Sequence, residues 1–431
     1  MRDVTRLPSK AWDAFAWSVG IWTMIRDRAS QEEAAPGCSM PRVMMVVPQY
    51  PYPVVGGLER QAHELAKALR ELGLDVLALS GRVDPGQPSY EIVEGITVFR
   101  IPWSRKKYVR FVRTPFDLYR VLRAQRKTYD VIHLHQHSWF GLFTILAARW
   151  LRIPILTKLP NVGKFGLPGL AAQRFGGLKL AILLCSDALV AMSRETLDEL
   201  QHAHFPTGRV LSTPNGIQLD RVRPVRNAGA FSPQPCRVVF VGRLSEQKRL
   251  DSLLAAWSKL IHSEKAYAIL ELWGSGPMET VLRRRCDELG LADSTIFRGH
   301  VEDVCSQLSA MDVFVLPSHA EGNSNALLEA MAAGLPIVST RVGGTPMLVG
   351  HEGANFLCKP GDVHSLAANL LKLIRDPELR AQVGLAMRRR VERHFDINRV
   401  AKTYADAYRF LTVGQRDRVQ ESSNPVVLEN G

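Results

Sequence analysis

Cysteines are scarce in this sequence, and none are spaced to bind a metal or to staple a small domain. The 431-residue chain contains six cysteines, Cys38, Cys185, Cys236, Cys286, Cys305 and Cys358. No two of them form a Cys-x-x-Cys pair or lie within the spacing of a zinc knuckle. Isolated cysteines are typical of small buried side chains in a reducing compartment, so the sequence predicts a cytoplasmic protein.

Long apolar runs are also missing. No stretch reaches the roughly 20 consecutive apolar residues that a membrane-spanning helix requires. The longest candidate near the N-terminus, residues 11–25, is shorter and contains Asp13, and no small-residue cleavage site follows it. Two interpretations remain: residues 11–25 form a helix that lies in a membrane interface, or translation starts at Met40. In both, residues 1–40 are an N-terminal extension outside the main fold.

A third missing feature is the motif Asp-x-Asp, which occurs nowhere in the chain. We therefore expect no Mg²⁺ held by paired aspartates, and no other cofactor. His133, His135 and His137 alternate along an expected strand and would share one face, so a zinc site is one interpretation. No fourth ligand or supporting carboxylate is suggested nearby, which favours the alternatives, namely histidines in the core or histidines that line a binding cleft.

The composition itself is that of a soluble protein with more than one domain. Hydrophobic residues make up 46% of the chain and charged residues 23%. These fractions exclude wholesale disorder, collagen-like repeats and a multi-span membrane protein. At about 150 residues per domain, the length predicts two or three domains, each large enough to bury its own core.

Positive charge is concentrated in the first half. Residues 41–210 contain 23 basic and 13 acidic residues, and much of the excess falls in residues 103–129, where aromatic side chains are interleaved with cations. The cations are Arg105, Lys106, Lys107, Arg110, Arg113, Arg120, Arg123, Arg126 and Lys127. Such a segment favours peripheral contact with an anionic membrane, here the inner face of the plasma membrane. A solvated helix face is the second interpretation, and nucleic-acid binding is the least favoured.

From residue 41 onward, short apolar runs alternate with helical periodicity, which predicts parallel βαβ units. The pattern runs through two series, so we expect an α/β protein of two doubly wound, Rossmann-like domains that face each other across an interdomain cleft. The expected boundaries are 41–220 for the first domain, 221–397 for the second, 398–412 for a helix that crosses back, and 413–431 for a disordered tail. The expected strands include 42–47, 131–135, 153–157, 237–242, 268–273 and 312–316. The expected helices include 58–72, 325–333 and 363–375.

Residues suited to bind an anion follow two of these strands. Gly56-Gly57 precedes a helix start, where backbone N–H groups and the helix dipole favour a phosphate. Gly242-Arg243 and Lys248 directly follow strand 237–242, where two cations can meet a diphosphate and stabilise it as it leaves. A tight glycine turn and solvated surface cations are the structural alternatives.

The strongest signal is a pair of carboxylates eight positions apart, Glu321 and Glu329, after strand 312–316. Glu321 would lie on the loop, where it can accept hydrogen bonds from sugar hydroxyls. Glu329 would lie one turn into a helix, where it could accept both hydroxyls of a ribose. The N–H groups of Gly322–Asn325 lie between them at the helix start and form an anion site.

Together these residues resemble the retaining nucleotide-sugar glycosyltransferases of family four, which have the GT-B fold. The likeness runs through most of residues 41–412. It is carried by Gly56-Gly57-x-Glu59, residues 130–135, Ser193, Pro214-Asn215-Gly216-Ile217, Gly242-Arg243-Leu244 with Lys248, Gly274-Ser275-Gly276-Pro277, and Glu321 with Glu329. The resemblance implies a metal-independent hexosyltransferase that acts on a glycan or lipid-linked acceptor, as in bacterial polysaccharide synthesis, with a UDP- or GDP-sugar as donor.

The resemblance also implies roles for single residues. The implied catalytic residues are Arg243 and Lys248 on the diphosphate, Glu321 near the donor hexose, and His135 from the acceptor-side domain. The implied donor-binding residues are Gly57, Gly242, Gly322, Asn323, Ser324, Asn325 and Glu329. Relatives often carry His-Gly where this chain has Lys158-Leu159-Pro160-Asn161, so we expect Lys158, Asn161 and Lys164 to contact an acceptor that differs from theirs. A sugar-nucleotide epimerase and a non-catalytic nucleotide-sugar binder are the alternative functions.

Overall fold

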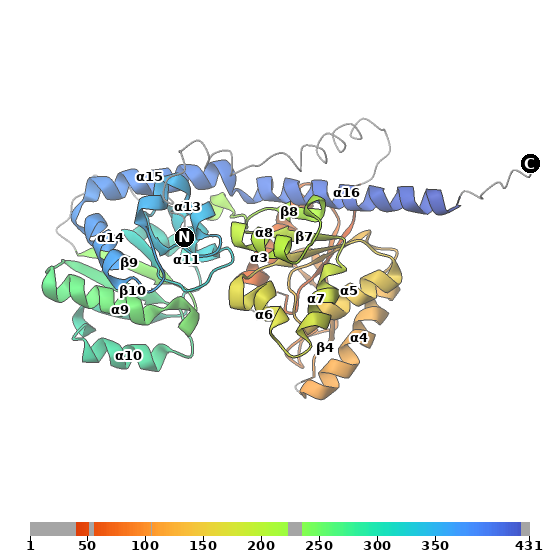
Figure 1. Cartoon of the computed structure of the whole chain (residues 1–431), viewed down its shortest axis with the longest axis horizontal. Coiled ribbons are helices and arrows are strands. Elements are labelled where there is room, and N and C mark those ends of the chain that lie inside the picture. Colours follow the sequence, from red (N-terminus) through yellow and green to blue (C-terminus); the bar gives the residue numbers. More distant parts are fainter. Residues whose placement is uncertain (1–39, 51–55, 105, 223–234, 424–431) are drawn as a thin grey trace, which may run out of the picture. The chain divides into compact units, whose positions relative to one another are not determined.

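The computed structural model describes residues 40–50, 56–104, 106–222 and 235–423, and it divides into two compact units (Figure 1). The C-terminal unit contains Pro214–Ile397 together with Ser193–Glu195. The N-terminal unit contains the described residues up to Met192, Thr196–Thr213, and the chain from Asn398 onward. The expectations for residues 1–39 and for Arg105 concern positions outside the described residues.

The N-terminal unit is built on an eight-stranded sheet in the order β3-β4-β2-β1-β5-β6-β7-β8. Only β3 and β4 pair antiparallel, as a hairpin that turns at Glu94-Gly95, and the other neighbours are parallel. The central strands are buried on both faces, which is typical of a parallel sheet covered by helices. The strands are β1 (Val43–Val46), β2 (Val76–Arg82), β3 (Tyr90–Val93), β4 (Ile96–Pro102), β5 (Val131–Leu134), β6 (Ile155–Leu159), β7 (Ala188–Ala191) and β8 (Val210–Ser212).

The two faces of this sheet carry different side chains. One face presents Met44, Val46, Ile132 and Leu134, which pack in a single apolar core with residues of α4, α5 and α7. Because successive residues of a strand point to opposite faces, His133 and Lys158 lie on the other face. The helices of the unit are α3 (Gly57–Glu71), α4 (Lys107–Ala124), α5 (Trp139–Leu151), α6 (Leu167–Ala171), α7 (Gly176–Leu184), α8 (Arg194–His202) and α16 (Ile397–Ser423).

The C-terminal unit contains a six-stranded parallel sheet in the order β11-β10-β9-β12-β13-β14. The order changes direction between β9 and β12, which is the switch point of a doubly wound sheet. The strands are β9 (Cys236–Val241), β10 (Ala268–Trp273), β11 (Thr295–Gly299), β12 (Val313–Leu316), β13 (Ile337–Thr340) and β14 (Leu357–Cys358). The helices are α9 (Leu250–Ser258), α10 (Glu279–Glu288), α11 (Val304–Gln307), α12 (Asn325–Ala333), α13 (Thr345–Gly353), α14 (Val363–Arg375) and α15 (Pro377–His394).

Two expectations about the chain's organisation differ from the structure. Residues 413–423 were expected to belong to a disordered tail, but α16 continues to Ser423. This part of the chain has no proline and is rich in Gln, Arg and Glu, which tolerate a helix, so polarity alone was a poor signal of disorder. The change of unit falls at Pro214 rather than near residue 221, because Ile217 donates from its N–H to the carbonyl of Phe395 and so joins the C-terminal unit.

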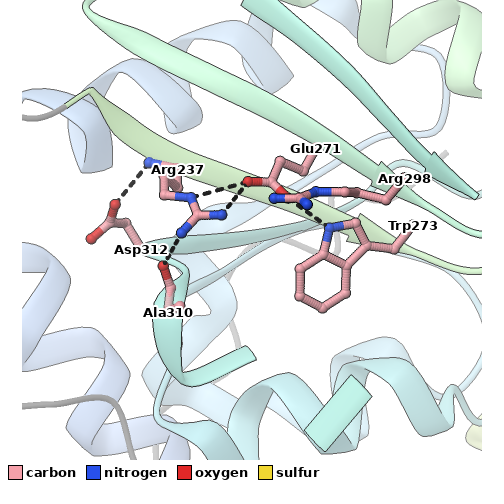
Figure 2. Close-up of polar contacts among 6 residues, drawn as sticks. All are labelled: Arg237, Glu271, Trp273, Arg298, Ala310 and Asp312. Atoms are coloured by element: carbon pink, nitrogen blue, oxygen red, sulfur yellow. Dashed lines mark hydrogen bonds and ion pairs between the residues drawn. The ribbon is translucent and has the colours of Figure 1, made fainter. Parts of the chain in front are cut away.

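A buried carboxylate ties together three strands of the C-terminal unit (Figure 2). Glu271 on β10 accepts hydrogen bonds from Arg237 on β9 at 2.5 and 3.0 Å, and from Arg298 on β11 at 3.0 Å. The indole Nε1 of Trp273 donates a further bond at 2.9 Å. Burial alone would raise the pKa of Glu271, but these hydrogen bonds outweigh it, and the pKa lies below its ordinary value. Arg237 also donates to the carbonyl of Ala310.

Candidate active site

The loop after β9 brings a glycine and two cations to the carboxyl end of its strand. Gly242 has a φ of 154°, and a Cβ there would press against the ring of Phe240 and the stem of Lys248. This backbone conformation, together with the 3.1 Å that would separate the Cβ from the Phe240 ring, favours glycine at the position. Arg243 is exposed and makes no hydrogen bond or ion pair with any residue in the described ranges. Its guanidinium is available to a ligand.

Lys248 pairs directly with Glu321. The Nζ of Lys248 lies 2.6 Å from Oε1 of Glu321, and the two side chains are only 17% and 8% exposed. The loops that carry them are joined by two further bonds, from Gln247 Nε2 to the carbonyl of Ala320 at 2.7 Å and from the N–H of His319 to the carbonyl of Gln247 at 2.8 Å. Two segments 73 positions apart in the sequence thus form one charged, mostly buried centre.

The start of α12 is capped by a serine, and a glycine lets the segment after β13 pass close to the loop that precedes the helix. Ser324 accepts a bond from the N–H of Leu327 at 3.4 Å, as expected for an N-cap. Gly343 has a φ of 50°, and a Cβ there would overlap the carbonyl oxygen of Glu321. The N–H of Gly344 donates to the carbonyl of Gly322 at 2.8 Å. These contacts fix the loop over residues 321–324 against the segment after β13.

Asn215 was noted only within a motif, but the structure gives it a defined role at this loop. Its Nδ2 donates to the carbonyl of Asn323 at 3.1 Å and to Oδ1 of Asn325 at 2.8 Å, and its own N–H donates to Oδ1 of Asn323 at 3.2 Å. The backbone N–H of Asn215 thus bonds the Asn323 side chain, and its side chain bonds the Asn325 side chain, so one residue contacts both asparagines of the expected donor site. The Pro-Asn-Gly sequence that contains Asn215 was the only signal available for it.

Glu329 lies on α12, where it is 7% exposed between buried neighbours on the same helix. A carboxylate at this depth is largely removed from solvent. Within the C-terminal unit, the structure therefore places Gly242, Lys248, Glu321 and the start of α12 at the carboxyl ends of β9 and β12, which are neighbouring strands. This is the edge where ligands bind in doubly wound sheets.

The remaining expected site residues belong to the N-terminal unit. Gly57 begins α3, a helix of 15 residues, and the carboxylate of Glu59 folds back against Gly56. Burial raises the pKa of Glu59. Asn161 and Lys164 follow β6, and Lys164 is exposed with its Nζ 5.4 Å from the centre of the Phe165 ring.

Lys158 was expected in a loop after strand 153–157, and that placement is wrong. The strand β6 continues to Leu159, with Lys158 paired to Val190 and Leu159 to Ala191 of β7. Lys158 is consequently buried, and burial lowers its pKa to about 7. Continuing the β5–β6 register from His133 and Leu156 places Lys158 opposite His135 on the same face.

His135 follows β5 and is buried, with no partner in the described parts of the chain for either ring nitrogen. Its ring lies 4.0 Å from that of His133, centre to centre. Burial lowers the pKa of both histidines well below the ordinary value, and Lys158 adds to the effect. Both rings are therefore neutral near pH 7, and His135 can donate and accept one hydrogen bond each.

The described ranges contain neither a metal-binding cluster nor a membrane-spanning helix. No group of three or more His, Cys, Asp or Glu side chains there is arranged to hold a metal ion, and the histidines after β5 are no exception. Over the same ranges, no helix combines the length and the apolarity needed to cross a membrane.

Comparisons with known proteins place both halves of the chain in related groups. Residues 55–221 match the family model described as Glycosyltransferase Family 4, and residues 235–376 match the model described as Glycosyl transferases group 1. Glycogen synthase of Mycobacterium tuberculosis is 27% identical over 402 residues, which covers 87% of this chain and 96% of that protein.

Solved structures show the same fold. Sucrose-phosphate synthase from Thermosynechococcus elongatus superposes with a TM-score of 0.71 at 21% identity, covering 89% of this chain and all of that one. The Anabaena protein HepE, solved in complex with UDP-glucose, superposes with a TM-score of 0.68 at 18% identity, covering 85% and 99%. The two parallel-sheet units, the strand-end site and these matches agree: the chain belongs to the GT-B glycosyltransferases, with a family 4 domain followed by a group 1 domain.

Proposed function

We propose that this glycosyltransferase moves a hexose from a UDP- or GDP-sugar to a glycan or lipid-linked acceptor with retention of configuration and without a metal ion. The observation that supports this most directly is the buried Lys248–Glu321 pair, with the unpaired Arg243 on the same loop. The HepE structure, which contains UDP-glucose, supports a nucleotide sugar as donor.

The chemistry follows from where charge develops. The bond between the anomeric carbon and the diphosphate oxygen breaks, and the diphosphate departs with additional negative charge. Lys248 and Arg243 stabilise that charge, together with the N–H groups at the start of α12, in a region with little water. Glu321 orients Lys248 and accepts a hydrogen bond from a hydroxyl of the hexose, while Glu329 accepts hydrogen bonds from the ribose hydroxyls. The departing phosphate takes the proton of the acceptor hydroxyl that attacks from the same face, which retains the configuration.

The first test removes the charge of Lys248 while keeping a hydrogen bond to Glu321. We expect Lys248→Gln to lower kcat by about 10²- to 10³-fold, because the lost charge acts on the leaving diphosphate, while the hydrogen bond that glutamine can keep to Glu321 limits the loss of stability. Transfer is measured with radiolabelled donor sugar. Lys359→Gln, an exposed lysine of the same unit, is the matched control. Equal activity of Lys248→Gln and the wild type would remove Lys248 from the mechanism.

Donor choice and metal independence are tested with the same protein. A UDP- or GDP-sugar at about 100 times its Kd should stabilise the folded protein by about 2.7 kcal/mol, measured as a shift in Tm. Glu329→Ala should abolish this shift if Glu329 binds the ribose. Transfer should persist in excess EDTA, and its loss on chelation would contradict the proposed leaving-group stabilisation. Formation of an epimerised nucleotide sugar in place of transfer would support the alternative activity.

We also propose that the enzyme works at the inner face of the plasma membrane, through α4. Its outer face exposes Tyr108, Phe111 and Phe116, at 81%, 48% and 65%, between cations. Because α4 packs on the sheet face opposite to His133 and Lys158, contact of α4 with a membrane leaves the face that carries His133 and Lys158 unobstructed. Aromatic side chains among cations are suited to the interface of an anionic bilayer.

Vesicle sedimentation tests this surface. Changing Lys106, Arg113 and Arg120, all exposed, to glutamine should weaken binding to anionic vesicles by about 10²-fold, at roughly 1 kcal/mol per cation. Binding to neutral vesicles should stay low for both proteins. Unchanged binding at low salt would assign these cations to an ordinary solvated helix face.

A further inference from the structure

The C-terminal helix α16 contributes two tyrosines to the face of the N-terminal unit's sheet that carries His133. Tyr408 and Tyr404 are fully buried and stack with each other at 6.2 Å between ring centres. The hydroxyl of Tyr408 lies 2.7 Å from Nδ1 of His133, a buried hydrogen bond between residues 275 positions apart. The ring of Tyr404 lies 4.9 Å from that of His133, but its hydroxyl has no hydrogen-bond partner in the described residues.

We infer that Tyr408 is a positioning residue for His135 and acts through His133. The hydrogen bond fixes the rotation of the His133 ring, whichever of the two groups carries the shared proton. The centre of that ring lies 4.0 Å from the centre of the His135 ring, with the two planes tilted by 32°, so the His133 ring restricts the rotation of His135 in turn. The inference rests on the proposed function, in which His135 contacts the reacting sugars.

Three observations indicate that His135 needs such support. Both of its ring nitrogens are without partners in the described residues, so no hydrogen bond within those residues orients it. It follows the end of β5, where its backbone N–H donates to the carbonyl of Val46 at 3.0 Å. The tilted ring of His133 lies against the ring of His135, and His133 is itself hydrogen-bonded to Tyr408. A ring that is oriented before the substrate arrives loses less freedom on binding.

The same geometry provides its own control. Tyr408→Phe removes a hydroxyl that is hydrogen-bonded, whereas Tyr404→Phe removes one that is not, from a neighbouring ring of the same helix. We expect Tyr408→Phe to lower kcat by about tenfold with the donor KM unchanged, which is the effect of one lost positioning bond. The kcat of Tyr404→Phe should stay within about twofold of the wild-type kcat.

A double-variant cycle separates positioning from simple destabilisation. When His135 is already replaced by leucine, Tyr408→Phe should cause no further loss of kcat, because its effect passes through the missing ring. The imidazole ¹⁵N resonances of His133 and His135 should shift in Tyr408→Phe and not in Tyr404→Phe. Equal losses in the two tyrosine variants, an unchanged loss in the His135→Leu background, or unshifted resonances would each overturn the inference. If the wild type transfers no sugar, the proposed function fails, while the resonances still test the link.

Discussion

Glu271 in the C-terminal unit and His135 in the N-terminal unit are equally buried, with 1% of each residue exposed, yet they are bonded in opposite ways. Glu271 accepts four hydrogen bonds from three side chains (Figure 2). His135 has two ring nitrogens, and neither has a partner in the described parts of the chain. Both residues follow the rule that buried polar groups are expensive, but only Glu271 obeys the rule that they are satisfied.

This difference predicts that Glu271 stabilises the fold, whereas His135 serves function. The hydrogen bonds of Glu271 connect β9, β10 and β11, and they lower its pKa despite burial, so the charged form belongs to the folded state. Burial lowers the pKa of His135 and of Lys158. Unfavourable burial of this kind persists where function requires it. The comparison therefore predicts that the Glu271 cluster, Glu271 with its partners Arg237, Arg298 and Trp273, contributes to stability, and that the His135 cluster, His135 with His133 and Lys158, contributes to activity.

The largest expected effect comes from removing the satisfied carboxylate. Glu271→Ala leaves Arg237, Arg298 and the Trp273 N–H without their common acceptor, and should lower the free energy of unfolding by about 3–5 kcal/mol. Urea unfolding measures this change. Glu302→Ala, an exposed acid of the same unit, should stay within about 0.5 kcal/mol of the wild type. A loss below 1 kcal/mol for Glu271→Ala would remove the distinction between the two clusters.

The corresponding change in the other cluster should act on catalysis. His135→Leu replaces two unpaired nitrogens with an apolar side chain of similar size, so stability should be unchanged or increased. Turnover should fall by about 100-fold, in the range for a lost proton-transfer or hydrogen-bonding group. Steady-state kinetics and urea unfolding on the same preparation give both values. Destabilisation without loss of kcat would make His135 an ordinary core residue.

The third effect concerns Lys158 and depends on pH. Lys158 binds its proton more weakly in the folded protein, with a pKa of about 7, than in the unfolded chain, where the ordinary value is 10.5. Its burial therefore opposes folding fully below pH 7, and this cost disappears as the pH rises toward 10.5. Lys158→Met should raise the free energy of unfolding at pH 7 by about 1–4 kcal/mol.

Urea unfolding at two pH values checks the direction of this pH dependence. The gain from Lys158→Met should shrink between pH 7 and pH 10, because the wild type loses its penalty over that interval. Lys164→Met, at an exposed position in the same unit, should show neither the gain nor the pH dependence. A gain that stays constant with pH would assign the effect to packing rather than to charge.

The contrast between the clusters also shows what sequence patterns can predict. Local periodicity predicted β10, α12 and α14 with the bounds that the structure has, because strand and helix limits depend on nearby residues. The positions of Gly242, Lys248 and Glu321 after strands could be predicted for the same reason. The Lys248–Glu321 pair could not, because nothing local indicates which loop faces which.

Contacts between distant segments were missed most completely. The bond from Tyr408 to His133 joins a helix near the C-terminus to β5, and neither residue has a local signal for it. Lys158 was assigned to a loop because a lysine seldom ends a buried strand, and its burial depends on pairing with β7. Glu271 was overlooked because a single acid in an apolar run does not reveal that two arginines converge on it.

The smallest effect tests whether the Glu271 cluster is redundant. Arg298 is half exposed and supplies only one of the four bonds to Glu271, so Arg298→Ala leaves the carboxylate paired with Arg237 and Trp273. The free energy of unfolding should fall by about 1 kcal/mol, the value of one hydrogen bond, rather than by the cost of a buried unpaired charge. Arg284→Ala, which breaks an exposed pair on α10, should cost less. A loss of stability near that of Glu271→Ala would show that Glu271 needs every one of its partners. The Glu271 cluster would then not be redundant.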